Sequence, residues 1–196
     1  MTALAQFEGN ILCWLQQNLR TPFFDGAAVV LGFLGEAGLI WIALTLVLMY
    51  FKKTRRVGFY CGISILLTFI MVNLIVKPIA ARTRPYDLFE MLVPLGVVPH
   101  DGSFPSGHTA NAFSCAWVLF RCAQTTRVSA IRKIGLPALI LAILISLSRI
   151  YSVIHFPSDV FGGALIGIIM SEVSIHAFKK PVKKLFKRYP LLRAGK

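Results

Sequence analysis

Charged residues are scarce in this sequence, and acidic residues are the scarcest. The 196 residues include 8 Asp and Glu against 21 Lys and Arg, and charged residues make up only 15%. Soluble domains carry about a quarter charged residues, so this composition argues against an ordinary soluble protein. Hydrophobic residues make up 56% and lie in long blocks, with a mean hydropathy of +0.70. We therefore expect an integral membrane protein.

Three further signals are missing. The first ten residues contain no Lys or Arg, so we do not expect a cleavable signal peptide, which begins with positive charge. The four cysteines form no C-x-x-C pair, and we interpret them as small buried apolar residues rather than a disulfide or metal framework. His, Asp and Glu show no metal-ligand spacing, so neither a metal nor another cofactor is expected.

Positive charge is concentrated in three short segments. Sixteen of the 21 Lys and Arg lie in residues 52–56, 121–133 and 179–196, which contain no Asp or Glu. Such clusters beside apolar blocks are typical of cytoplasmic loops. The net charge of +13 is therefore not interpreted as nucleic-acid binding. Residues 179–196 are expected to form a basic cytoplasmic tail that lies on anionic lipid headgroups.

The apolar blocks predict the fold class. With their flanks, five of them can span a membrane: 27–50, 57–76, 107–122, 134–150 and 158–178. Residues 4–19 place Phe7, Ile11 and Trp14 at helical spacing between polar residues, which predicts an amphipathic helix on the membrane surface. No repeat or linker divides the chain, so residues 1–196 are expected to form a single domain. The predicted fold is all-α, a polytopic transmembrane helical bundle of about five spans with an interfacial N-terminal helix.

The distribution of charge also predicts topology. If residues 52–56 are cytoplasmic, five spans place residues 1–26, 77–106 and 149–158 on the opposite face. These contain the five remaining cations: Arg20, Lys77, Arg82, Arg84 and Arg149. The positive-inside rule thus assigns these segments to the outer face without any assumption about function. The sequence indicates no oligomeric state.

One polar segment, Ser148-Arg149-x5-His155-x3-Asp159, joins the fourth and fifth blocks. Asp159 is close enough in sequence to accept a hydrogen bond from His155, which would fix the tautomer and leave the other nitrogen as a better nucleophile. The alternative is an interfacial histidine beside an acid that favours a helix N-terminus. From this pair alone, both interpretations stay open.

Two other segments end or begin apolar blocks: Lys77-x6-Arg84-Pro85 and Pro105-Ser106-Gly107-His108. The backbone N–H groups that start the third span can bind a phosphate oxygen, Ser106 adds a hydroxyl, and His108 can protonate a leaving oxygen. A helix cap by Ser106 is a compatible alternative. Lys77 supplies a point charge and Arg84 a bidentate fork for phosphate, although both could simply reach lipid headgroups.

Position for position, these segments resemble the three signature motifs of the type-2 phosphatidic acid phosphatase superfamily, K-x6-R-P, P-S-G-H and S-R-x5-H-x3-D. The resemblance covers about residues 22–178. Members usually show six spans, and here the 4–19 helix stands in place of the first. The resemblance implies that His155 attacks phosphorus to form a phosphohistidine, that Asp159 orients it, and that His108 protonates the leaving group and then activates water. It implies phosphoryl-oxygen binding by Lys77, Arg84, Ser106, Gly107 and Arg149.

The same resemblance implies a metal-independent lipid phosphatase. The small size of the chain fits an enzyme of a bacterial inner membrane, and the distribution of charge predicts that its site lies on the outer face. Its substrate would be a membrane lipid phosphate. Undecaprenyl diphosphate is placed first, phosphatidylglycerophosphate second, and phosphatidic acid or lipid A phosphates after them. A non-catalytic lipid-phosphate binder or transporter is the rival hypothesis. It is disfavoured because a binder needs only the cations and not the set of His155, Asp159 and His108.

Other polar residues near these segments are given lesser roles. Arg82 is a weaker candidate than the arginine of the Arg-Pro pair. Glu36 lies in the first apolar block between two glycines that could bend the helix, and a structural or substrate-channel role is favoured over catalysis. His100 and Asp101 are expected in a solvated loop.

Overall fold

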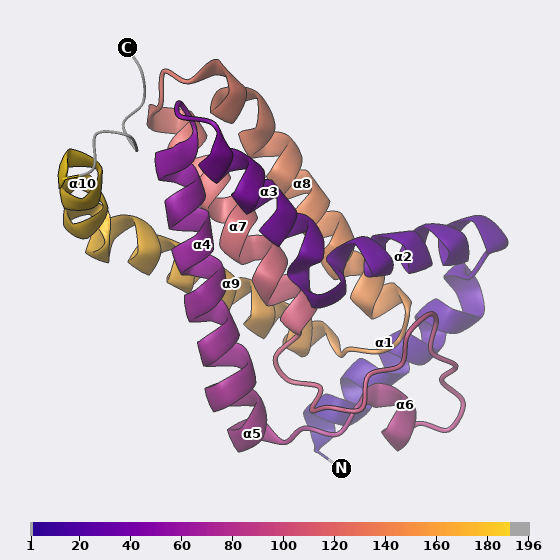
Figure 1. The fold of residues 1–196 in the computed structure, drawn as a ribbon. Helices are drawn as coiled ribbons and strands as arrows, with labels where there is room; N and C mark the ends of the chain where they lie inside the picture. Colours follow the sequence, from indigo (N-terminus) through magenta and orange to yellow (C-terminus); the bar gives the residue numbers. More distant parts are fainter. Residues whose placement is uncertain (1, 189–196) are drawn as a thin grey trace.

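The computed structural model describes residues 2–188, which form helices and no strand (Figure 1). The α-helices are α1 (Ala3–Leu19), α2 (Pro22–Gly35), α3 (Leu39–Tyr50), α4 (Arg55–Phe69), α5 (Lys77–Ala80), α6 (Pro85–Leu88), α7 (Gly107–Thr125), α8 (Ser129–Tyr151), α9 (Pro157–Ala177) and α10 (Lys179–Arg188). Within the described residues, 4 stretches are long and apolar enough to cross a membrane: Pro22–Tyr50, Arg55–Leu88, Ser129–Tyr151 and Pro157–Ala177. The predicted all-α polytopic bundle is confirmed.

The remaining expected span, α7, is the central helix of the bundle. Its 19 residues extend about 28 Å, close to the thickness of a bilayer core. It packs against α4, α8 and α9, so much of its surface faces protein rather than lipid. Small buried residues, among them Ala110, Ser114 and Ala116, allow this packing at the expense of hydropathy. On α9, a Cβ at Gly163 would lie 2.6 Å from the carbonyl oxygen of Ser106, so α9 approaches the start of α7 closely there.

The first apolar block, expected as one span, is broken into two helices. A 3-10 turn, η1 (Glu36–Gly38), separates α2 from α3, and α2 runs across the end of the bundle at a steep angle to α3 (Figure 1). Ala37 and Gly38 both adopt positive φ, 47° and 71°, which interrupts the helical hydrogen-bond ladder. The bend expected from the flanking glycines is therefore confirmed, and it directs α2 over the predicted site.

The predicted N-terminal amphipathic helix is α1. Phe7 and Trp14 are exposed on its outer face, at 63% and 57%, as expected of a helix that meets lipid. Its inner face buries Leu12 against Val153 and Phe156, in a small apolar cluster next to the turn between α8 and α9. This contact fixes α1 at the end of the bundle that also carries α6 (Figure 1).

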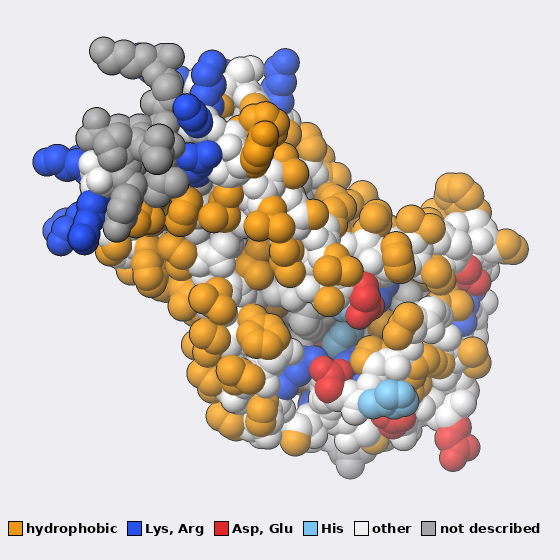
Figure 2. All heavy atoms as spheres, in the orientation of Figure 1, with side chains coloured by type: hydrophobic (Ala, Val, Ile, Leu, Met, Phe, Trp, Pro, Cys, Tyr) orange, Lys and Arg blue, Asp and Glu red, His pale blue; other side chains and the backbone are white. Residues whose placement is uncertain are grey.

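Charge divides the two ends of the bundle. Figure 2 shows Lys and Arg gathered around α10, and acidic and histidine side chains at the opposite end beneath α2. The predicted motifs lie at this second end, so their predicted separation from the basic segments is present in the fold. Of the predicted basic tail, α10 is described, and residues 189–196 lie outside the described residues.

Candidate active site

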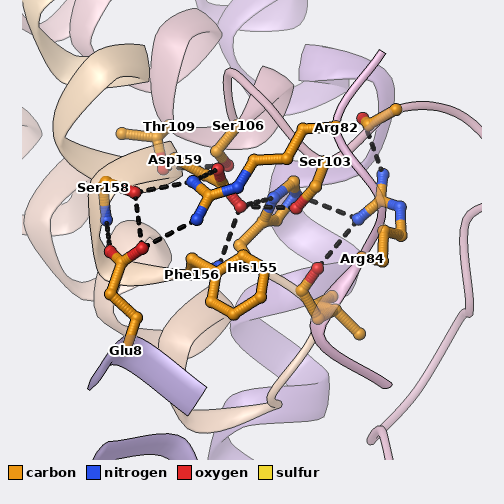
Figure 3. Close-up of polar contacts among 12 residues, drawn as sticks. Glu8, Arg82, Arg84, Ser103, Ser106, Thr109, His155, Phe156, Ser158 and Asp159 are labelled. Atoms are coloured by element: carbon orange, nitrogen blue, oxygen red, sulfur yellow. Dashed lines mark hydrogen bonds and ion pairs between the residues drawn. The ribbon is translucent and has the colours of Figure 1, made fainter. Parts of the chain in front are cut away.

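The three predicted segments meet at one end of the bundle. There α5, the start of α7 and the turn between α8 and α9 surround a cavity of about 260 Å³. Five predicted site residues line it: Lys77, Arg84, Gly107, His108 and His155. Ser106, Arg149 and Asp159 are buried next to these residues rather than on the wall itself. Figure 3 shows how contacts around Asp159 extend from this cavity to α1.

His155 and Asp159 form the expected pair. Nδ1 of His155 lies 3.5 Å from Oδ2 of Asp159, and Nε2 lies 3.4 Å from Nη1 of Arg84. The same carboxylate oxygen accepts hydrogen bonds from the backbone N–H of Phe156 at 2.8 Å and from Ser103 Oγ. Asp159 is thus held rigidly on the Nδ1 side of the ring, which leaves Nε2 free to face the cations.

The environment keeps this imidazole neutral. His155 is only 2% exposed, and burial lowers its pKa. The Asp159 carboxylate opposes the shift, while the positive charges of Arg84 and Lys77 add to it. The net pKa lies below the ordinary value, so Nε2 keeps its lone pair near neutral pH.

Asp101 is the acidic partner of both cations of the first predicted segment. It forms ion pairs with Lys77 and with Arg84, the latter at 2.6 Å. Burial favours the neutral acid, but hydrogen bonds from Lys77 and Arg84 hold the pKa of Asp101 below its usual range. Asp101 lies in an exposed loop, as expected, with its side chain 53% exposed. It also reaches the two cations, because the segment between α6 and α7 folds back over the cavity. His100, one residue earlier, is exposed as expected.

The backbone fixes Arg84 more firmly than Lys77. Arg84 is 3% exposed and donates to the carbonyl oxygens of Ile154 at 2.9 Å and Asp101 at 2.8 Å. Lys77 follows a π-helical segment, η2 (Ile70–Val76), which joins α4 to α5. Such segments are rare and often occur at functional sites, and no sequence signal predicted this one.

The start of α7 is open to the cavity at Gly107. Apart from its chain neighbours, no atom of residues 2–188 lies within 4 Å of the position that a Cβ would take there, so a ligand oxygen can approach the helix N-terminus. Ser106 is the N-cap residue but makes no side-chain cap, and its Oγ accepts a hydrogen bond from Thr109 at 3.1 Å. Its backbone N–H donates to the carbonyl oxygen of Asp159, which joins the second and third segments.

His108 and Glu36 face each other across the cavity lining. Nε2 of His108 lies 3.5 Å from a carboxylate oxygen of Glu36, beyond a well-formed hydrogen bond. Within the part of the chain that the structure describes, this buried nitrogen has no hydrogen-bond partner. His108 can therefore exchange a proton with a bound ligand.

Arg149 lies under α2. It is 5% exposed and donates to Ser148 Oγ at 3.1 Å and to the carbonyl oxygen of Ala28 at 3.3 Å. The structure thus brings Arg149 to the site but not to the cavity wall. Its positive charge therefore lies between α2 and the cavity lining, without a side-chain atom on the cavity wall.

Two residues at the site were missed or ranked low from sequence. Arg82 donates to Oδ1 of Asp159 at 2.6 Å and to Oε2 of Glu8 at 2.7 Å (Figure 3). The available signal for Glu8 was its position four residues before Leu12, on the face of α1 opposite the exposed stripe.

A strained residue precedes the histidine. Val153, in the turn between α8 and α9, has φ of 51° and is fully buried. A β-branched residue in this region is a genuine outlier, of a kind that clusters at functional sites and costs about 1–3 kcal/mol.

An apolar groove adjoins the polar cavity. It has a volume of about 470 Å³ and lies between α3 and α4, with Ile42, Leu46 and Ile65 in its lining. The groove and the cavity share Ala37, Phe69 and Asn111, so the two spaces are contiguous.

Comparison with known proteins agrees with the motifs. A family model described as the PAP2 superfamily matches residues 56–183, and the chain belongs to this superfamily. It is therefore a membrane protein of a lipid phosphatase family. The undecaprenyl-diphosphatase of Sulfolobus acidocaldarius is 31% identical over 147 residues, covering 74% of this chain and 68% of that protein.

Two further relatives span more of the chain. Phosphatidylglycerophosphatase B of Bacillus subtilis is 25% identical over 178 residues, covering 85% of this chain and 80% of that protein. The crystal structure of Aquifex aeolicus LpxE superposes with a TM-score of 0.71 at 32% identity, covering 85% of this chain and 93% of that chain. The expected membership of the superfamily is thus confirmed.

Proposed function

We propose that this chain is a metal-independent lipid phosphatase that removes the terminal phosphate from a lipid phosphate or diphosphate. The observation that carries the proposal is the junction between the polar cavity and the apolar groove. A phosphate headgroup fits beside His155 and Arg84, and the attached chain fits along α3 and α4. A water-soluble phosphate ester would need no such groove.

The first chemical step is attack by Nε2 of His155 on phosphorus. The P–O bond to the leaving group breaks as the P–N bond forms, and His108 gives its proton to the departing oxygen. Asp159 faces Nδ1, so it stabilises the positive charge that develops on the imidazole.

The second step releases phosphate. Neutral His108 takes a proton from water, whose oxygen attacks phosphorus as the P–N bond breaks and the electron pair returns to His155. Lys77, Arg84 and the N-terminus of α7 at Gly107 stabilise the equatorial oxygens in both steps. Lys77 and Arg84 can bind these oxygens only when they release or share Asp101.

Undecaprenyl diphosphate is the proposed substrate. A relative named undecaprenyl-diphosphatase is 31% identical to this chain, whereas the phosphatidylglycerophosphatase is 25% identical. Phosphatidylglycerophosphate is the alternative, followed by phosphatidic acid. A long isoprenoid chain would occupy the groove and continue into the bilayer.

We also propose that the protein lies in a bacterial cytoplasmic membrane, with the cavity on the outer face. The support is the separation of charge between the two ends of the bundle, since Lys and Arg gather at cytoplasmic ends.

Cysteine labelling of intact cells tests this orientation. Val97 is 71% exposed in the segment between α6 and α7, and Lys53 is exposed at the basic end. Val97→Cys should react with a membrane-impermeant maleimide applied to intact cells, whereas Lys53→Cys should react only after lysis. Wild type provides the background from the native cysteines. The reverse pattern of labelling would refute the outward-facing site.

The basic end has a proposed partner as well. A cavity of about 540 Å³ lies between α4, α10 and the segment that joins α7 to α8. Its lining includes Lys52, Lys53, Arg56, Lys183 and Lys187. We propose that it receives the headgroup of an anionic lipid, which such a set of cations attracts by about 1 kcal/mol each.

The test of the main proposal is phosphate release by purified protein in detergent with EDTA present. Undecaprenyl diphosphate, phosphatidylglycerophosphate and phosphatidic acid are compared for wild type and His155→Ala, with His176→Ala as the control, because His176 lies in the last turn of α9, near the basic end. We expect release that EDTA does not change and that only His155→Ala abolishes. A lipid-phosphate binder would instead bind all three lipids without release and without an acid-labile phosphohistidine.

A further inference from the structure

Glu8 is a buried acid on the interfacial helix α1. It is 3% exposed, and a buried carboxylate is costly unless it is paired. Its Oε1 accepts a hydrogen bond from the backbone N–H of Ser158 at 2.6 Å, and its Oε2 accepts one from Ser158 Oγ at 2.9 Å. Ser158 is the second residue of α9, so Glu8 satisfies a free amide and complements the dipole at the start of that helix.

Arg82 connects this acid to the site. Its Nη2 donates to Glu8 Oε2 at 2.7 Å, and its Nη1 donates to Asp159 Oδ1 at 2.6 Å. The guanidinium carbon also lies 4.2 Å from the centre of the Phe156 ring, which packs against its face. The planar guanidinium thus binds one carboxylate on each side and packs its face on an aromatic ring, and these contacts together fix its orientation (Figure 3).

Asp159 needs such a partner. It is fully buried, and its neighbour His155 is neutral before the reaction. Arg82 is therefore the cation that compensates the Asp159 carboxylate and fixes the direction of Oδ1. With Oδ1 held, Oδ2 stays directed at Nδ1 of His155.

We propose that Glu8 and Arg82 are positioning residues, which hold Asp159, and through it His155, in the geometry for attack on phosphorus. The inference rests on the proposed phosphatase function. It assigns a task to α1, which lies outside the segment that matches the family model, residues 56–183. Leu12, buried on the same face of α1, holds the helix where Glu8 can reach α9.

The experiment measures kcat and KM for Glu8→Gln and Arg82→Lys, with Glu90→Gln as the matched control. Glu90 is exposed, and its substitution makes the same chemical change. We expect kcat to fall about tenfold or more in both variants with KM within about twofold, as when a supporting hydrogen bond to a catalytic group is lost. Glu90→Gln should match wild type. A wild-type kcat in Glu8→Gln would overturn the proposal.

A double substitution separates positioning from general stability. In the Asp159→Asn background, Glu8→Gln should change kcat by less than about twofold, because its effect passes through the missing carboxylate. A further tenfold loss there would overturn the proposal, since it would mean that Glu8 acts independently of Asp159.

Vanadate binding keeps the two proposals distinguishable. Vanadate mimics the five-coordinate phosphoryl group and needs no turnover, and its affinity can be measured by calorimetry. We expect about tenfold weaker binding in Glu8→Gln than in wild type and Glu90→Gln. If the wild type binds vanadate but releases phosphate from no lipid, the phosphatase proposal fails, and this comparison still decides the positioning role. Equal affinities, or no binding by the wild type, would overturn it.

Discussion

Gly32 of α2 leaves the space that the guanidinium of Arg149 occupies. A Cβ at Gly32 would lie far inside van der Waals contact with Nη2 of Arg149. The next turn repeats the relationship, since a Cβ at Gly35 would lie 2.9 Å from the ring of His108. The glycines of α2 thus allow this helix to lie close over two site residues.

Substitution of Gly32 by Ala should therefore impair catalysis. Arg149 must move to admit the methyl group, and a displacement of about 1 Å at a site can cost about a hundredfold in rate. Gly26→Ala, on the same helix, is the control, because none of the described side chains lies within 4 Å of its Cβ position. We expect kcat/KM to fall at least about tenfold for Gly32→Ala alone; equal activities of the two variants would contradict this account.

If Lys77 and Arg84 bind the substrate phosphate as proposed, Asp101 competes with that phosphate for them. In Asp101→Asn both cations are released from the ion pairs, and inorganic phosphate should inhibit more strongly. A half-exposed pair is worth about 1 kcal/mol, so the inhibition constant should fall about fivefold. Asp87→Asn, at an exposed position on α6, should leave it unchanged. Weaker inhibition in Asp101→Asn would mean that the carboxylate organises the cations instead.

The lowered pKa of His155 predicts that its ring stays neutral, and so reactive, in mildly acidic solution. Because burial favours the neutral ring, the pH at which His155 is half protonated should lie below about 6.5, the ordinary pKa of histidine. Asp159→Asn removes the group that opposes the shift, so this midpoint should move to still lower pH. Acylation of His155 by diethyl pyrocarbonate, followed by mass spectrometry, measures it, since the reagent attacks neutral imidazole. A midpoint above about 6.5, or an upward move in the variant, would refute the prediction.

The apolar groove predicts a substrate-dependent effect at Gly62. Thr45 Cγ2, at 3.6 Å, is the one neighbouring atom of the described residues within 4 Å of its Cβ position, so a larger side chain can project into the groove without a backbone clash. Gly62→Leu should raise KM for the lipid about tenfold, because apolar contacts of this size are worth about 1–3 kcal/mol. Hydrolysis of p-nitrophenyl phosphate should be unchanged. Equal losses for both substrates would argue against a tail site.

The basic cavity predicts lipid selectivity at the other end. Lys53→Gln combined with Lys183→Gln should reduce binding of an anionic lipid over a neutral one, by about fivefold for each lysine. Native mass spectrometry of the protein in mixed-lipid nanodiscs measures this ratio. Lys133→Gln, exposed outside the cavity, serves as the control. An unchanged ratio in the double variant would reject a headgroup site.

The bundle and its motifs could be predicted because their signals are local. Apolar blocks indicate helices, and His155 and Asp159 are four residues apart, so a single turn brings their side chains together. The hydropathy signal was weakest for α7, whose small and polar residues face protein on most sides.

The supporting contacts could not be predicted because they join distant segments. Glu8 and Arg82 are 74 positions apart, and their meeting depends on how α1 packs. Asp101 reaches the cations only because its loop folds back, which no periodic pattern reports. Similarly, the positive φ of Ala37 follows from the packing of α2, since alanine itself has no preference for it.

At Val153, backbone strain and side-chain packing affect the stability of the fold in opposite directions. Glycine would adopt the observed φ of 51° without strain, so Val153→Gly would relieve that local cost. Yet the valine side chain is fully buried against α1, and its loss would loosen the turn that leads into His155. Val153 thus keeps a strained backbone that glycine would relieve, while its buried side chain holds the turn that leads into the proposed nucleophile His155.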